Sequence, residues 1–175
     1  MFKLVLVAIL ALWANAYELS FDDGYINAHT EVLGDSNINP STKMISSNLS
    51  KEDSIESLKG KININAVDLK SGKEKRDSNM CELLNVTIHP DISFEIQSVQ
   101  KVEDKYIISG ILTLNGISRN ISSRAEIIES TESLSIEGGF DIELTDYGMQ
   151  PPKMFFLTVR NKIDISYLLN YKKAN

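Results

Sequence analysis

The chain has 175 residues, with 18 Lys and Arg against 24 Asp and Glu, and a formal net charge of −6. This acidic balance argues against a sequence-independent nucleic-acid surface, so we expect no nucleic-acid partner. The same negative charge gives no general attraction to an anionic membrane. The length fits one domain with one substantial core. The single cysteine, Cys81, cannot form an internal disulfide, and we interpret it as a spectator thiol.

Residues 1–16 have the features of a secretory signal peptide. Lys3 precedes an apolar run over residues 4–13, and Ala14-Asn15-Ala16 gives the small-x-small pattern of a cleavage site. The alternative is an N-terminal anchor, but the run is about half of the roughly 20 residues that a spanning helix needs. We therefore predict cleavage after Ala16, one mature domain over residues 17–175 and no stable membrane insertion. Removal of Lys3 would leave 17 basic and 24 acidic residues, a net charge of −7.

The first part of the mature chain gives weak signals. Residues 25–32 and 43–49 are weaker strand candidates, and the Ser/Asn-rich residues 34–53 are more typical of a long loop. From residue 58 onward, apolar and polar side chains alternate with the period of a half-buried strand. Leu58, Ile62, Ile64 and Ala66 predict the first strand of this series.

Residues 74–84 lack that alternation and predict a short helix or an irregular excursion between strands. Residues 92–97 and 106–114 alternate again, and a polar turn over residues 103–105 joins them. Asn115-Gly116 then precedes another alternating run over residues 117–127. An Asn-Gly pair between two such runs is a strong hairpin signal, because both residues tolerate positive φ.

The last two predicted strands cover residues 134–144 and 155–167. The first is the clearest alternation in the chain, with its apolar side chains on one face and acids and serines on the other. In the second, Asn161 is the odd member of the otherwise apolar face. The total of about eight strands is consistent with an antiparallel meander.

Eight strands with one apolar face each can form a two-sheet sandwich or a closed barrel, and an eight-stranded barrel either fills with side chains or holds one small ligand. Gly110, Gly138, Ala66 and Ala125 lie in register with the apolar set and leave space that larger side chains would fill. Small residues at barrel bends are an equally good explanation. From the residues alone, a plain core is favoured over a ligand wall.

Several motifs resemble those of the YceI-like family. Arg76-Asp77-Ser-Asn-Met80 and His89-Pro90-Asp-Ile92-Ser-Phe94 are similar to its R-D-x-H-L and P-x-I-x-F elements. The segment from Gly110 to Arg119 resembles its G-x-L-T-L-x-G-V-T-R hairpin, and Asp146-Tyr147-Gly148 resembles its D-F-G segment. Asn79 stands where the family usually has His, so no role of that His is carried over.

The resemblance implies an all-β fold, a single eight-stranded antiparallel lipocalin-like β-barrel with a short helix between strands. It further implies a Gram-negative periplasmic location, in agreement with the leader, and a capacity to form homodimers. The implied ligand is an amphiphilic isoprenoid-type lipid: a polyisoprenoid, an isoprenoid quinone or a fatty-acid amide. On this basis we expect the cavity to be lined by Phe94, Ile96, Ile108, Leu112, Phe140, Ile142, Phe155 and Val159.

The sequence favours a carrier over an enzyme. A hydrolase would need His29 or His89 as its base, and no G-x-S-x-G elbow surrounds a serine. The two histidines are sixty positions apart without ligand-spaced partners, so we expect no metal and no cofactor other than a bound lipid. Arg119 or Arg124 is a candidate partner for a lipid headgroup, although a solvated arginine is the simpler interpretation. The remaining alternatives are a lipid-acting hydrolase and a ligand-free β-sandwich.

Overall fold

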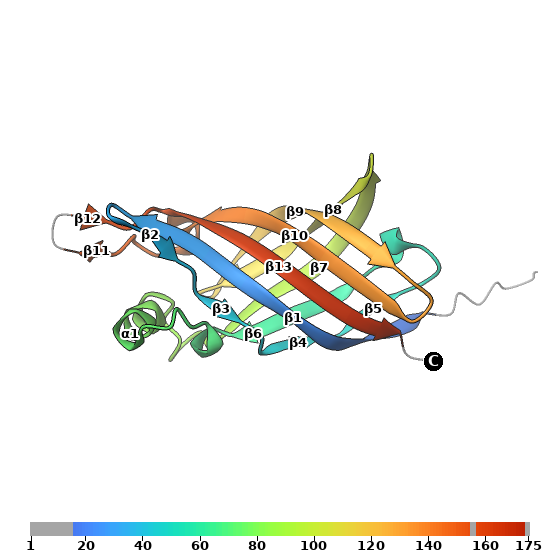
Figure 1. The fold of residues 1–175 in the computed structure, drawn as a ribbon, viewed down its shortest axis with the longest axis horizontal. Coiled ribbons are helices and arrows are strands. Elements are labelled where there is room, and N and C mark those ends of the chain that lie inside the picture. The colour runs from blue at the N-terminus through green and yellow to red at the C-terminus, as the bar shows by residue number, and fades with distance from the viewer. Residues whose placement is uncertain (1–15, 155–156, 174–175) are drawn as a thin grey trace, which may run out of the picture.

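The computed structural model describes residues 16–154 and 157–173. One helix, α1 (Glu74–Leu83), accompanies an eleven-stranded antiparallel sheet and a small two-stranded hairpin (Figure 1). The strands are β1 (Tyr17–Val32), β2 (Asp35–Ile38), β3 (Ser41–Thr42), β4 (Ile45–Ser47), β5 (Leu49–Lys51), β6 (Gly60–Asn65), β7 (Asp91–Val102), β8 (Lys105–Leu114), β9 (Ile117–Glu129), β10 (Ser133–Glu143), β11 (Lys153–Met154), β12 (Leu157–Thr158) and β13 (Lys162–Lys173). Three 3-10 turns are η1 (Ile55–Ser57), η2 (Ala66–Asp68) and η3 (Leu144–Tyr147).

The large sheet curls until its two edges meet. Its long strands follow the order β1, β13, β10, β9, β8, β7, β6, each antiparallel to the next. Residues 41–51 then join the two edges, because β3 and β5 pair with β1 while β4 pairs with β6. If this segment is counted as one strand, the wall has the predicted eight. The eleven long and short strands form one continuous curled sheet, which contradicts the alternative of a two-sheet sandwich.

The prediction of a long loop over residues 34–53 was wrong. These residues contain β2, β3, β4 and β5, and Asn48 N donates to Lys61 O at 3.0 Å while Asn48 Oδ1 accepts from Lys61 N at 2.9 Å. The strands are two to four residues long and rich in Ser and Asn, so they carry almost no alternation signal. Their pairing comes from the two neighbouring strands and not from local propensity.

The prediction of one strand over residues 155–167 was also wrong. The structure has β12 at Leu157–Thr158 and begins β13 at Lys162. Asn161, the odd residue of the apolar face, lies in the break: its Oδ1 accepts from Thr145 N at 3.2 Å, and its Nδ2 donates to Thr145 Oγ1 at 2.9 Å. These bonds hold it against η3 and not in a strand ladder.

Most other predicted elements are confirmed, although the strand predicted from Leu58 to Ala66 is the shorter β6 at Gly60–Asn65. α1 covers ten of the eleven residues predicted for the helix, and β10 occupies Ser133–Glu143 with its apolar residues facing inward. Asn115 and Gly116 have φ of 50° and 72°, the positive pair that a tight hairpin turn requires. The sequence signals that rest on strict alternation or on turn chemistry therefore located their elements correctly.

Side chains fill the barrel at the end where the C-terminus lies (Figure 1). The core there includes Leu134, Ile136 and Tyr171, each at most 1% exposed. The Tyr171 ring meets Phe21 edge-on at 5.7 Å between centroids, and its hydroxyl shares a 3.0 Å hydrogen bond with Ser47 Oγ of β4. A second cluster packs around Leu84, Leu114 and Tyr147 near α1 and η3, at the other end.

We expect Gly60→Ala to destabilise the seam between β6 and residues 41–51. A Cβ on Gly60, which has φ of +124°, would lie 2.2 Å from Asn48 O. Gly34→Ala is the matched control, because Gly34 also has positive φ (+89°) but nothing within 4 Å of an added Cβ. Urea unfolding should show a loss of roughly 1 kcal/mol for the control, from backbone strain alone, and a clearly larger loss for Gly60→Ala. Equal losses would contradict a tight seam.

We also expect stability to fall at alkaline pH through Tyr171. Burial raises the pKa of Tyr171 from 10.0 to about 12, against the opposing effect of the Ser47 hydrogen bond. Below pH 10 the phenol is neutral in both states, and its contribution to stability is complete. Between pH 10 and 12 the unfolded chain ionises first, so the free energy of unfolding falls, by up to roughly 2 to 3 kcal/mol for this group.

Tyr171→Phe should therefore make the alkaline fall shallower. Part of the fall should persist, because burial also raises the pKa of Tyr147 to about 12. Tyr17→Phe, at an exposed position, is the control. Unfolding curves across this pH range check the prediction, and an identical pH dependence in wild type and Tyr171→Phe would refute it.

Candidate ligand-binding cavity

The barrel is hollow between the filled core and α1. The cavity has a volume of about 310 Å³ and an almost wholly apolar wall, contributed by β1, β2, β6, β7, β8, β9, β10 and β13 together with α1. This volume is near the lower end of the range for small-molecule sites, roughly 300 to 1,000 Å³. The alternating face of the strands therefore serves partly as core and partly as the wall of a hollow.

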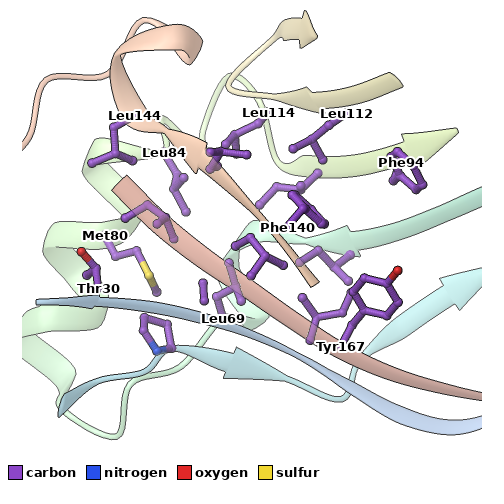
Figure 2. A pocket seen from close by; sticks show the side chains of 18 of the residues that line it. Thr30, Leu69, Met80, Leu84, Phe94, Leu112, Leu114, Phe140, Leu144 and Tyr167 are labelled. Carbon is purple, nitrogen blue, oxygen red and sulfur yellow. The ribbon is translucent and has the colours of Figure 1, made fainter. Parts of the chain in front are cut away.

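The structure places seven of the eight expected lining residues on the cavity wall. They are Phe94, Ile96, Ile108, Leu112, Phe140, Ile142 and Val159. Phe155 lies outside the described residues. Figure 2 shows Phe94 and Tyr167 at one end of the cavity, Met80 and Thr30 at the other, and Leu112 and Phe140 between them. A role for these side chains in ligand binding remains a prediction.

Two glycines let aromatic rings lie along the wall. A Cβ on Gly110 would come within 2.6 Å of the Phe94 ring, and one on Gly138 would come within 2.6 Å of the Tyr167 hydroxyl. The space that these glycines leave is thus occupied by neighbouring aromatic rings and is not itself the hollow. Ala66 and Ala125, expected to leave space too, are 1% and 2% exposed within the packed clusters.

The deep part of the cavity contains one internally satisfied polar pair. Ser123, which is 1% exposed, donates to Gly139 O at 3.1 Å, and its Oγ lies 2.7 Å from the Tyr167 hydroxyl. Because the Ser123 proton is committed to the carbonyl, Tyr167 donates to Ser123. Both donors are used, so the deep wall presents little that would bind a polar group. Ile96, Ile108 and Ile136 also line the cavity.

Polar side chains gather instead at the α1 end, where Thr30, Arg76, Asn79 and Lys153 line the cavity. Arg76 Nη2 donates to Asp35 Oδ2 at 2.7 Å, which ties the helix to β2. The pKa of Asp35 is lowered, first by the hydrogen bond from Asn37 N and then by Arg76. This end we call the mouth of the cavity.

Sequence reasoning missed the contribution of α1 to the wall. Met80, Leu83 and Leu84 line the cavity, and Figure 2 shows the Met80 side chain extending from the helix toward Leu69. Their spacing of three and four residues is the signature of one helix face, and it was the available signal. It was obscured because the rest of α1 is charged on all sides.

The other candidate groups lie away from the cavity. Arg119 is exposed and its Nε donates to Asp146 O at 3.1 Å, while Arg124 is exposed on the outer face, so neither expected headgroup partner lines the cavity. His29 Nδ1 bonds Asn39 Oδ1 at 2.6 Å, and His89 packs beside the Asn115-Gly116 turn. Neither histidine is part of the cavity wall.

Neither a metal cluster nor a membrane-spanning helix is present in the described residues. No group of three or more His, Cys, Asp or Glu side chains in that part of the chain is placed to hold a metal ion. Within the same residues, no helix is both long and apolar enough to cross a bilayer. The geometry described so far therefore presents one main feature, an apolar hollow with a polar mouth.

Comparison with curated proteins gives relatives of partial coverage. A UPF0312 protein from Pectobacterium carotovorum is 35% identical over 78 residues, which is 45% of this chain and 41% of that protein. The chain thus matches less than half the length of this relative.

Solved structures share the fold at low identity. BcnA from Burkholderia cenocepacia superposes with a TM-score of 0.75 at 12% identity, covering 84% of this chain and 95% of that one. A polyisoprenoid binding domain from Saccharophagus degradans, implicated in plant cell wall breakdown, gives 0.63 at 12% identity, covering 90% and 98%. The YceI-like domain model matches residues 17–171, nearly the whole of the described chain. The chain therefore belongs to the YceI-like family.

Proposed function

We propose that this protein is a periplasmic carrier that holds an amphiphilic isoprenoid-type lipid, such as a polyisoprenoid, an isoprenoid quinone or a fatty-acid amide, in the barrel cavity. The observation that carries the proposal is the apolar hollow of about 310 Å³ inside the closed sheet. An apolar space of this size, shut at one end, suits a hydrocarbon chain better than a polar metabolite, because polar groups inside it would lose their hydrogen bonds to water.

The distribution of polar groups gives the ligand a direction. Arg76, Asn79 and Lys153 line the mouth, whereas the Tyr167–Ser123 pair in the deep part has its donors already engaged. The lipid tail would therefore lie between Leu112 and Phe140, and the headgroup would remain beside α1. Arg76 and Lys153 replace Arg119 and Arg124 as the proposed headgroup partners.

Solvent exclusion alone can supply the affinity. Each buried CH₂-sized group contributes about 0.8 kcal/mol, so one five-carbon isoprenoid unit contributes roughly 4 kcal/mol. Association costs on the order of 4 to 15 kcal/mol, and micromolar binding needs about 8 kcal/mol net. Burial of about three to six units is then sufficient without any strong polar contact. This is a binding role, and it requires no bond chemistry from His29 or His89.

The relationship to solved structures supports the ligand class. The Saccharophagus degradans structure that shares this fold is described as a polyisoprenoid binding domain. Its identity to this chain is 12%, so the likeness supports the shape of the barrel and leaves the particular lipid to experiment. Native mass spectrometry of protein purified from its own host tests the proposal, because a carrier should retain an intact lipid at one copy per chain.

We expect Leu112→Arg to abolish lipid retention. Leu112 lies on the cavity wall, and the longer charged side chain would occupy the space and bring water with it. Thr113→Arg is the matched control, with the same charge change on the outer face of β8, where Thr113 Oγ1 bonds Ser118 Oγ. Native mass spectrometry should show at least about a tenfold lower lipid occupancy for Leu112→Arg, a loss of roughly 1.4 kcal/mol or more.

The control should keep its lipid, and circular dichroism melting should show that both variants are folded. Equal lipid occupancy in Leu112→Arg and wild type would contradict binding in this cavity.

The periplasmic part of the proposal predicts a processed N-terminus. Cleavage after Ala16 would leave Tyr17, the first residue of β1, at the start of the mature protein. Intact-mass analysis of the protein from an osmotic-shock fraction should match residues 17–175. Replacing Ala14 and Ala16 together by Gln should block processing, because the cleavage site requires small residues. Recovery of wild-type chain with residues 1–16 still attached would oppose this assignment.

A further inference from the structure

Exposed apolar side chains gather on the connections at the mouth of the cavity. Leu33 in the β1–β2 turn is 80% exposed, Ile88 between α1 and β7 is 67% exposed, and Val67 in η2 is 43% exposed. In Figure 1, α1 and the β1–β2 connection lie at the end of the barrel opposite the C-terminus. Thr30 of β1 and Arg76 of α1 line the cavity at this end.

Single exposed apolar residues are common and need no explanation by themselves. These three differ because a basic segment accompanies them. Residues 70–76 contain Lys70, Lys73, Lys75 and Arg76 against the single acid Glu74, in a chain whose net charge is −6. The three lysines are exposed, and no ion pair found in the described residues involves them.

Two of the acids next to this segment, Asp35 and Asp77, are already engaged. Asp35 accepts from Arg76 at 2.7 Å, and Asp77 accepts from Ser71 N at 2.8 Å and from Ser71 Oγ at 2.6 Å. The lysines at the start of α1 therefore present positive charge to the solvent beside the mouth. The acidic composition, which argues against a general attraction to anionic membranes, is thus unevenly distributed over the surface.

We infer that the mouth end is a docking surface for an anionic lipid bilayer. Lys70, Lys73 and Lys75 would face the anionic headgroups, and Leu33, Val67 and Ile88 would enter the boundary between headgroups and acyl chains. The anionic bilayer repels the acidic remainder of the protein surface. This repulsion orients the barrel with its cavity toward the bilayer. This inference rests on the proposed carrier function: a docked barrel receives a lipid chain without exposing it to water.

The test is flotation of the protein with vesicles of phosphatidylcholine alone and of phosphatidylcholine with phosphatidylglycerol. Wild type should bind the anionic vesicles preferentially, and added salt should weaken the binding. The triple variant Lys70→Gln/Lys73→Gln/Lys75→Gln should lower the affinity at least about tenfold. Leu33→Ser/Ile88→Ser should also lower the affinity for anionic vesicles, and this loss should depend less on the salt concentration.

Matched controls come from the opposite end of the barrel. Val102→Ser/Ile128→Ser removes two side chains that are 45% and 63% exposed, and Lys59→Gln/Lys101→Gln/Lys172→Gln removes three exposed lysines. Both control variants should bind vesicles as wild type does. Failure of wild type to bind anionic vesicles, or equal losses in mouth and control variants, would overturn the inference. If the lysine variant also loses binding to vesicles of phosphatidylcholine alone, the electrostatic part of the inference would be overturned.

Lipid retention separates this inference from the carrier function. The mouth variants should keep their co-purified lipid in native mass spectrometry, since none of the substituted residues lines the cavity, while transfer of that lipid to acceptor vesicles slows. A chain that retains lipid but binds no vesicles would contradict the docking surface alone. A chain that binds vesicles through the mouth but never holds lipid would contradict the carrier function and leave the surface in place.

Discussion

The hydrogen bonds that residues 41–51 make to β1 on one side and to β6 on the other turn a curled sheet into a closed wall. Without this seam, two strand edges would face solvent, and the inner apolar face would need another layer to cover it. With it, the inner face encloses a space that only side chains or a ligand can fill. The seam is also where Tyr171 of β13 reaches Ser47 of β4, so packing and backbone pairing reinforce each other there.

The interior is divided unequally along the barrel axis. Large side chains such as Leu134 and Tyr171 fill the end near the termini, whereas the wall toward α1 surrounds a hollow. The filled end supplies much of the burial that stabilises the fold, and the cluster around Leu84, Leu114 and Tyr147 adds to it beside the hollow. A cavity of this kind costs stability, because its lining loses the van der Waals contacts that a close-packed core would have. Folding stability alone would favour a filled interior, so a bound ligand is the better explanation for the hollow.

Much of the fold was predictable because its strands bury one face. β10 alternates strictly, β8 and β9 alternate in part, and the Asn115-Gly116 turn requires positive φ, so local chemistry identified these strands. The short strands of residues 41–51 gave only a weak signal over residues 43–49, since their pairing depends on neighbours distant in sequence. The Asn161 break was missed because its hydrogen bonds to η3 cannot be inferred from periodicity. The sequence indicated the wall residues on the strands but not Arg76 and Met80 at the mouth, because the charged residues of α1 obscured the apolar face of the helix.

The central claim is that one elongated lipid occupies the hollow, and a crystal structure of the protein purified from its own host tests it most directly. We expect continuous electron density for a single lipid chain that begins beside Arg76 and Met80, passes between Leu112 and Phe140, and ends before Tyr167. Ordered water along this path, or side chains that have collapsed to fill it, would contradict the account.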